Sequence, residues 1–150
     1  SKHPHLKSAV SFSLETACRQ GEMLKAKREH VNWKRRTLWF YDTKNGTDRK
    51  IALSETAYSI LLSLPEREDG KLFPFKNRDE LNWYWLRALK DAGIKDFVYH
   101  DLRRTGCTWM FEYKNLQVPQ VQLMSGHRDP RVLLRIYTNL NPEKLVAQLG

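Results

Sequence analysis

Apolar residues recur at helical spacing along most of the chain and are separated by short polar turns. Residues three or four positions apart share one face of an α-helix, so these stripes predict helices that each bury one face. We expect helices over residues 7–18, 54–64, 77–93, 100–113, 118–126, 130–137 and 141–149, with a short basic helix opening at Arg19.

Residues 30–53 follow a different pattern. Three short runs rich in β-branched and aromatic residues, 30–33, 37–41 and 49–53, are separated by polar turns that include Asn45 and Gly46. Such runs predict strands joined by hairpins. The fold class expected is therefore α+β, mainly α, with a small three-stranded antiparallel sheet.

Two of the expected helices have clear apolar stripes. The helix over residues 77–93 opens on Asn77 and Glu80, which resemble a capping box. Its core stripe is expected to be Leu81, Trp85, Leu86, Leu89 and Ala92. In the helix over residues 100–113, His100 and Arg103 are expected to point away from a stripe of Leu102, Gly106, Trp109, Met110 and Tyr113.

Length and composition favour a single globular domain. The 150 residues are 41% hydrophobic, which is enough for one real core. No apolar run approaches the roughly 18 residues of a membrane span, so a soluble intracellular protein is expected. Cys18 and Cys107 lack the spacing of a zinc or disulfide site, so metal binding and thiol catalysis are disfavoured. Because the first residue is not Met, we expect a fragment of a longer chain.

The charge balance favours a polyanionic partner. The chain has 26 Lys and Arg against 17 Asp and Glu, a formal charge of +9, and such an excess favours nucleic acid. Basic residues crowd into residues 25–36 around Trp33 and recur at 44–50. A solvated charged face remains the alternative, and charge alone does not distinguish DNA from RNA or anionic lipid.

Candidate chemistry centres on residues 99–105. His100 and Arg103 are three residues apart, so an imidazole and a guanidinium share one helical face and could bind a single anion. Arg19 precedes Glu22, which could brace an arginine or simply occupy a first helical turn. Lys44 lies at the tip of the second expected hairpin, from which an ammonium could reach a ligand.

Five motifs in order resemble the tyrosine recombinase (phage integrase) family. They are Arg19 in residues 17–22, Lys44 in 43–46, His100 and Arg103 in 100–105, His127 in 125–127, and Tyr137 in 136–138. The resemblance covers nearly the whole chain as a catalytic domain, residues 1–150, and the family's N-terminal DNA-binding domain is expected outside it. Tyr137 follows His127 one residue later than is usual in the family.

The resemblance implies DNA cleavage without metal, cofactor or ATP. Tyr137 would attack the scissile phosphate and form a 3′-phosphotyrosyl bond. Arg19 and Arg103 would bind the phosphate oxygens, and His127 would donate a hydrogen bond to them. His100 would accept the tyrosine proton, and Lys44 would protonate the leaving oxygen.

The resemblance also implies partners. Double-stranded DNA is the expected substrate, with a homotetramer on DNA, a monomer for the isolated domain, accessory DNA-bending proteins, no membrane, and a cytoplasmic, nucleoid-associated location. Two alternatives remain: a DNA-binding module of this fold without catalysis, and a type IB topoisomerase-like enzyme. The residues expected to contact DNA are Lys25, Lys27, Arg28, Arg35, Arg36, Lys44, Arg49 and Arg104.

Overall fold

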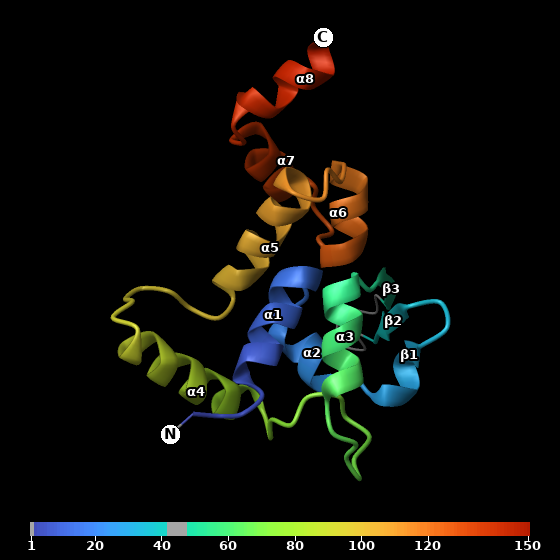
Figure 1. Ribbon diagram of the computed structural model, residues 1–150, viewed down its shortest axis with the longest axis vertical. Coiled ribbons are helices and arrows are strands. Elements are labelled where there is room, and N and C mark those ends of the chain that lie inside the picture. The colour runs from blue at the N-terminus through green and yellow to red at the C-terminus, as the bar shows by residue number, and fades with distance from the viewer. Residues whose placement is uncertain (1, 42–47) are drawn as a thin grey trace.

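The computed structural model describes residues 2–41 and 48–150, and within them the protein is mainly helical with one small sheet (Figure 1). The elements in chain order are α1 (Leu6–Thr16), α2 (Gln20–Lys25), η1 (Arg28–His30), β1 (Val31–Asn32), β2 (Thr37–Phe40), β3 (Arg49–Ala52), α3 (Glu55–Ser63), α4 (Arg78–Asp91), α5 (Asp101–Glu112), α6 (Val118–Ser125), α7 (Arg131–Thr138), η2 (Pro142–Lys144) and α8 (Leu145–Leu149). The expected fold class is confirmed.

The sheet has three strands in the order β1-β2-β3, with antiparallel pairing throughout, as the hairpin pattern predicted. Successive residues of β2 alternate between the two faces. Leu38 is buried beside Ile51, whereas Trp39 is exposed opposite Lys50. The first strand is shorter than expected because His30 ends a 3₁₀ turn instead of entering the sheet.

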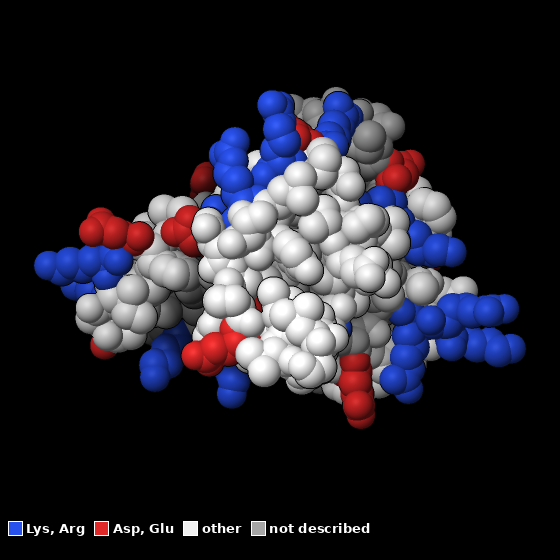
Figure 2. All heavy atoms as spheres, turned by 90° about the horizontal axis from the view of Figure 1, so that it is seen from above, with Lys and Arg blue, Asp and Glu red and all other residues white. Residues whose placement is uncertain are grey.

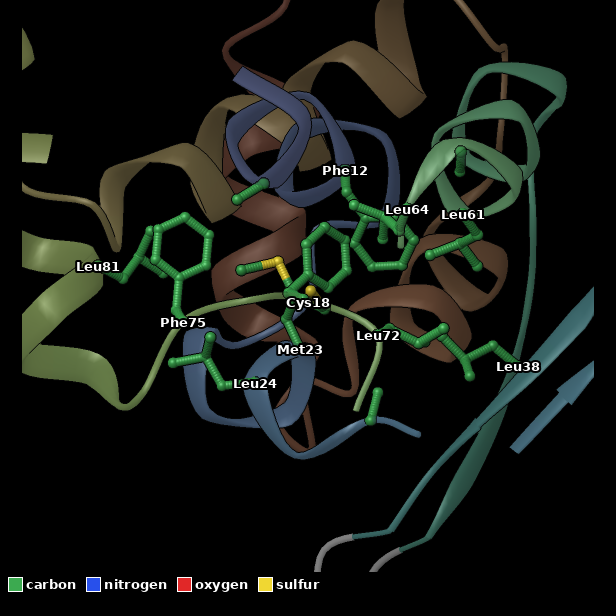
Figure 3. Packing of buried hydrophobic residues seen from close by; sticks show 14 of the residues in the cluster. Phe12, Cys18, Met23, Leu24, Leu38, Leu61, Leu64, Leu72, Phe75 and Leu81 are labelled. Atoms are coloured by element: carbon green, nitrogen blue, oxygen red, sulfur yellow. The ribbon is translucent and has the colours of Figure 1, made fainter. Parts of the chain in front are cut away.

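Two apolar clusters form the interior. The larger joins α1, α2, the sheet, α3 and α4, and Figure 3 shows Phe12, Met23 and Leu72 packed at its centre. The smaller joins α5, α6 and α7 around Cys107, Val121 and Leu133. In Figure 1 the second group of helices stands above the first, with α1 and α5 meeting between them. The segment after α1 therefore lies where the two clusters adjoin.

Local signals account for several helix ends. Ser54 Oγ accepts the Ala57 N–H at the start of α3, and Asn77 Oδ1 accepts the Glu80 N–H at the start of α4. Gly126 ends α6 with φ of +76°, a conformation that glycine adopts without strain. Helix α1 ends earlier than expected because Ala17 takes a left-handed conformation with φ of 54°. That turn sets the direction of Arg19.

The expected stripes on α4 and α5 are correct only in part. On α4, Leu81, Trp85 and Leu89 are buried, but Leu86 is 60% exposed and Ala92 is also exposed. On α5 the contacts with α6 and α7 turn the buried face toward Arg103, Cys107 and Phe111. Trp109 and Tyr113 consequently lie at the surface and not in the core.

The C-terminal segment projects from the body at the top of Figure 1. The predicted cap is confirmed, since Asn141 Oδ1 accepts the Glu143 N–H. The helix itself is shorter than expected, because a 3₁₀ turn precedes α8. The apolar residues of α8, namely Leu145, Val146 and Leu149, are between 45% and 81% exposed, so this helix has an uncovered apolar face.

Candidate phosphate-binding site

Arg103 is buried between the two apolar clusters. It is only 5% exposed, although the sequence placed it on an outward face of its helix. Its Nη1 donates to the carbonyl oxygen of Ala17, at 2.9 Å, and to that of Ser125. These two carbonyls end α1 and α6, and the packing of both helices on α5 explains the burial. Arg103 thus joins three helices at one point.

The other nitrogens of Arg103 remain available. Nε and Nη2 make no hydrogen bond within residues 2–41 and 48–150, yet no buried side-chain nitrogen or oxygen there lacks a partner. Those two nitrogens are therefore reached by solvent. A guanidinium presents its donors in a fixed planar fork that suits two oxygens of a phosphate. Arg103 is held by one end and open at the other.

His127 follows the turn at Gly126 and is held by Ser125. Ser125 is fully buried, and its Oγ lies 2.6 Å from His127 Nδ1. The His127 N–H also points to this hydroxyl, at 3.4 Å. Because Ser125 occupies Nδ1, Nε2 is the nitrogen left to meet a ligand. The Ser125 carbonyl binds Arg103, so one residue orients two site side chains.

Arg19 precedes α2 on the other side of the site. Its N–H donates to Glu22 Oε1 at 2.8 Å, and its Nη1 lies 3.7 Å from Glu22 Oε2. The arginine side chain is 38% exposed, whereas that of Glu22 is only 6% exposed. Glu22 therefore braces Arg19 and the first turn of α2, as the sequence suggested, while about a third of the Arg19 side chain stays accessible.

The charges of the site act on both histidines. Burial, followed by the positive charges of Arg103 and Arg19, lowers the pKa of His127 to about 4. The same three causes, in the same order, lower the pKa of His100. Burial also lowers the pKa of Arg103 to about 10, which leaves it charged at neutral pH. The structure thus brings Arg19, His100, Arg103 and His127 into one electropositive site.

Tyr137 lies apart from this cluster. Its ring packs edge to face on Phe111, with ring centroids 5.2 Å apart, and the residue is 45% exposed. Phe111 comes eight residues after Arg103 on α5, a rise of about 12 Å. Among the described residues, no hydrogen bond or ring contact joins Tyr137 to Arg103 or to either histidine. Lys44 lies outside the described residues.

The residues expected to contact DNA differ in their exposure. Arg35 and Arg36 are exposed in the β1-β2 turn. Arg28 is half-buried and donates to the Leu64 carbonyl at 3.1 Å. Of the remainder, Lys25 and Arg104 are exposed and Lys27 is half-buried.

Arg49 corrects the sequence interpretation. It was expected to contact DNA, but its side chain is only 12% exposed and its guanidinium binds the Glu22 carboxylate and the Met124 carbonyl. The physical reason is register, because alternation along β3 turns Arg49 inward with Ile51 while Lys50 faces outward. This inward direction could have been read from the alternation, but the partners could not.

Thiol and metal chemistry receive no support from the described residues. Cys18 and Cys107 are buried, and burial raises the pKa of each thiol to about 11, so both stay protonated at neutral pH. Within the described ranges, no three His, Cys, Asp or Glu side chains are grouped so that they could hold a metal ion. None of the described helices has the length and apolarity needed to cross a membrane.

The sequence from residue 1 to residue 144 matches the phage integrase family. The chain belongs to that family. A shufflon-specific DNA recombinase of Escherichia coli is 35% identical over 92% of this chain, and the integrase of Salmonella phage P22 is 28% identical over 93%. The chain spans 35% of the length of the first relative and 40% of the length of the second.

Solved structures support the same fold. The Tn1549 transposon integrase in complex with a circular intermediate DNA superposes with a TM-score of 0.75, covering 95% of this chain and 57% of that one at 17% identity. XerA recombinase gives a TM-score of 0.69, covering 96% and 60% of the two chains at 20% identity. This chain therefore has the fold of a tyrosine recombinase catalytic domain.

Proposed function

We propose that this chain is the catalytic domain of a site-specific DNA recombinase that acts through Tyr137. Family membership supports the reaction class, and the open fork of Arg103 beside Arg19 and two histidines is the single observation that carries it. Permanently charged guanidiniums suit a transition state whose negative charge spreads over non-bridging phosphate oxygens. Neither a metal ion nor ATP takes part in the proposed reaction.

The proposed reaction exchanges one phosphodiester for another. The Tyr137 oxygen attacks the scissile phosphorus, the bond to the 5′ oxygen breaks, and a 3′-phosphotyrosyl linkage forms. The tyrosine proton leaves and the departing oxygen gains one, which yields a free 5′-hydroxyl. Attack of a 5′-hydroxyl on the linkage reverses these steps, so rejoining needs no external energy.

The histidines of the proposed site suit proton transfer and hydrogen bonding. A lowered pKa keeps His100 neutral at pH 7, so its imidazole can accept the proton of Tyr137. His127 would donate a hydrogen bond from Nε2 to a phosphate oxygen while Ser125 holds Nδ1. Lys44 is proposed as the general acid for the leaving oxygen. A bound phosphate would raise the pKa of both histidines, because it offsets the arginine charges.

Cleavage in this scheme requires Tyr137 to approach the phosphate. In the structure its ring packs on Phe111, about 12 Å along α5 from Arg103. Helix α7 contacts α5 through Leu133 and Ile136, while Tyr137 is 45% exposed. We infer that α7 shifts on DNA binding, a movement of an element end of the kind that completes many active sites.

Double-stranded DNA is the proposed substrate, and a homotetramer on DNA is the proposed assembly, with accessory DNA-bending proteins as further partners. Helix α8 supports an assembly because its apolar residues are uncovered. Figure 2 views the molecule from this end and shows a largely uncharged centre with Lys and Arg side chains around the margin. We propose that the protein acts in the cytoplasm, bound to DNA, and that the isolated domain is a monomer.

A suicide-substrate assay tests this function. A nicked duplex traps the covalent intermediate by losing the short 5′-hydroxyl strand, and the adduct is scored on a denaturing gel. We expect an adduct with the unchanged chain and with Tyr113→Phe, a control at the exposed residue that follows α5, and none with Tyr137→Phe. DNA binding without any adduct would instead favour the non-catalytic module. Relaxation of supercoiled DNA without paired sites would favour the topoisomerase-like enzyme.

A further inference from the structure

The Arg49 guanidinium makes its hydrogen bonds with residues next to the proposed site. Nη1 and Nη2 donate to the two carboxylate oxygens of Glu22, the latter at 3.1 Å. Nε and Nη2 also donate to the Met124 carbonyl, at 3.2 Å and 3.1 Å. The guanidinium lies over the Phe40 ring, 5.0 Å from its centroid. All three nitrogens of the fork are therefore occupied by the protein itself.

These contacts end on two segments that carry proposed catalytic side chains. Glu22 also accepts the N–H of Arg19 at 2.8 Å, so it fixes the start of α2. Met124 is the third residue before His127, at the end of α6. Arg49 itself opens β3. One guanidinium thus links the segments of Arg19 and His127 to the sheet.

The turn at Gly126 is shaped around this guanidinium. A Cβ built on Gly126 would lie 2.7 Å from Cζ and Nη1 of Arg49, closer than real side chains approach. Gly126 also has φ of +76°, so two independent constraints require glycine there. The hydrogen bonds and this close approach show that Arg49 and the turn before His127 fit against each other.

We propose that Arg49 is a positioning residue that holds the Arg19 and His127 segments in one arrangement for cleavage. The proposal rests on the recombinase function proposed above. A buried ion pair contributes little net stability, because desolvation offsets much of its attraction, but its planar bidentate geometry fixes orientation. A lysine ammonium at the same position cannot reproduce four contacts made in one plane.

Single-turnover cleavage at saturating DNA separates positioning from folding. Arg49→Lys keeps the positive charge opposite Glu22, so it preserves the fold better than a neutral substitution. We expect its cleavage rate constant per folded molecule to fall about 100-fold, the effect of misplacing catalytic groups by roughly 1 Å, with the DNA dissociation constant within about twofold of the unchanged chain. Lys50→Gln, one residue along on the outer face of the sheet, is the matched control and should cleave at the normal rate.

A double-mutant cycle adds a second test. Gly126→Ala pushes a methyl group into the guanidinium and should slow cleavage as Arg49→Lys does. The two changes together should slow cleavage by less than the product of their separate effects, because both disrupt one contact, while the strain of alanine at φ of +76° remains. Normal rate constants for Arg49→Lys, or strictly multiplicative losses in the double variant, would overturn the proposal.

Amide hydrogen exchange without DNA tests the same inference independently of cleavage. In Arg49→Lys the segment 122–128 should exchange at least tenfold faster, while the centre of α5 remains protected as an internal reference. Unchanged exchange in that segment overturns the positioning role, whatever the cleavage assay gives. If the unchanged chain forms no adduct but exchange rises as expected, the recombinase proposal fails while the structural link made by Arg49 stands.

Discussion

Replacing Arg103 by lysine separates binding of the phosphate from support of the fold. Arg103 uses Nη1 to satisfy the carbonyls of Ala17 and Ser125 and leaves Nε and Nη2 open. A lysine ammonium has three donors and no fork, so satisfying two buried carbonyls consumes most of its capacity. The variant keeps the charge at the junction of α1, α5 and α6 but loses the bidentate contact that we propose with phosphate.

The expected magnitudes differ for the two properties. Poorer hydrogen bonds to the two carbonyls, with the charge retained, should lower the free energy of unfolding by about 1 kcal/mol. Loss of a donor to a charged transition state should raise the cleavage barrier by about 3 to 4 kcal/mol, or slow cleavage about 10² to 10³-fold. The cleavage rate should therefore be affected far more than the free energy of unfolding.

Two measurements on one preparation check this expectation. Urea unfolding gives the free energy of unfolding, and single-turnover adduct formation at saturating DNA gives the rate constant per folded molecule. Arg104→Lys, at the exposed neighbouring position, is the control and should cleave normally if Arg104 only contacts the DNA backbone. Cleavage by Arg103→Lys within threefold of the unchanged chain would refute the phosphate-binding role of this arginine.

Three further outcomes are expected. The pKa of His127 is about 4 in the folded chain and about 6.5 in the unfolded chain. Its contribution to stability is therefore complete above pH 6.5 and falls by about 1 to 2 kcal/mol toward pH 4. The free energy of unfolding in urea should differ less between pH 7.5 and pH 4.5 in His127→Asn than in the unchanged chain. Gly106→Ala should lower the stability measured by thermal unfolding by about 2 kcal/mol, because its Cβ would lie 2.6 Å from a carbonyl oxygen of α1. Gly21→Ala has open space around it and should stabilise α2 by about 0.5 kcal/mol. Equal effects of the two substitutions would contradict the packing described. Lys25→Gln and Arg35→Gln should each lower the salt dependence of DNA binding by about one released ion, and an unchanged slope would remove that residue from the interface.

Sequence periodicity predicted the elements well because period and turn chemistry are local properties. The alternation of β2 and the glycine after α6 are examples, and both are present. The rotation of α5 was not predictable, because Trp109 and Phe111 are both apolar and only contacts with α6 and α7 decide which is buried. The burial of Arg103 follows from that same rotation.

The site shows the same division between local and long-range information. In the sequence, Ser125 stood out only as part of the motif at residues 125–127. Its hydrogen bond to His127 spans two residues, so it could have been inferred from that spacing. The bond between Arg49 and Glu22 spans 27 positions, so no local pattern could reveal it. Charge counting assigned Arg49 to DNA because sequence alone does not separate an exposed cation from one neutralised inside the protein.

The buried residues of α7 account for the position of Tyr137. Leu133 and Ile136 are three residues apart, and both are buried against the smaller core. Tyr137 follows Ile136 by about 100° around α7, which brings its ring to Phe111 at the edge of that core. Leu133 and Ile136 therefore decide which face of α7 is buried, and they place Tyr137 on the half-exposed side of the helix.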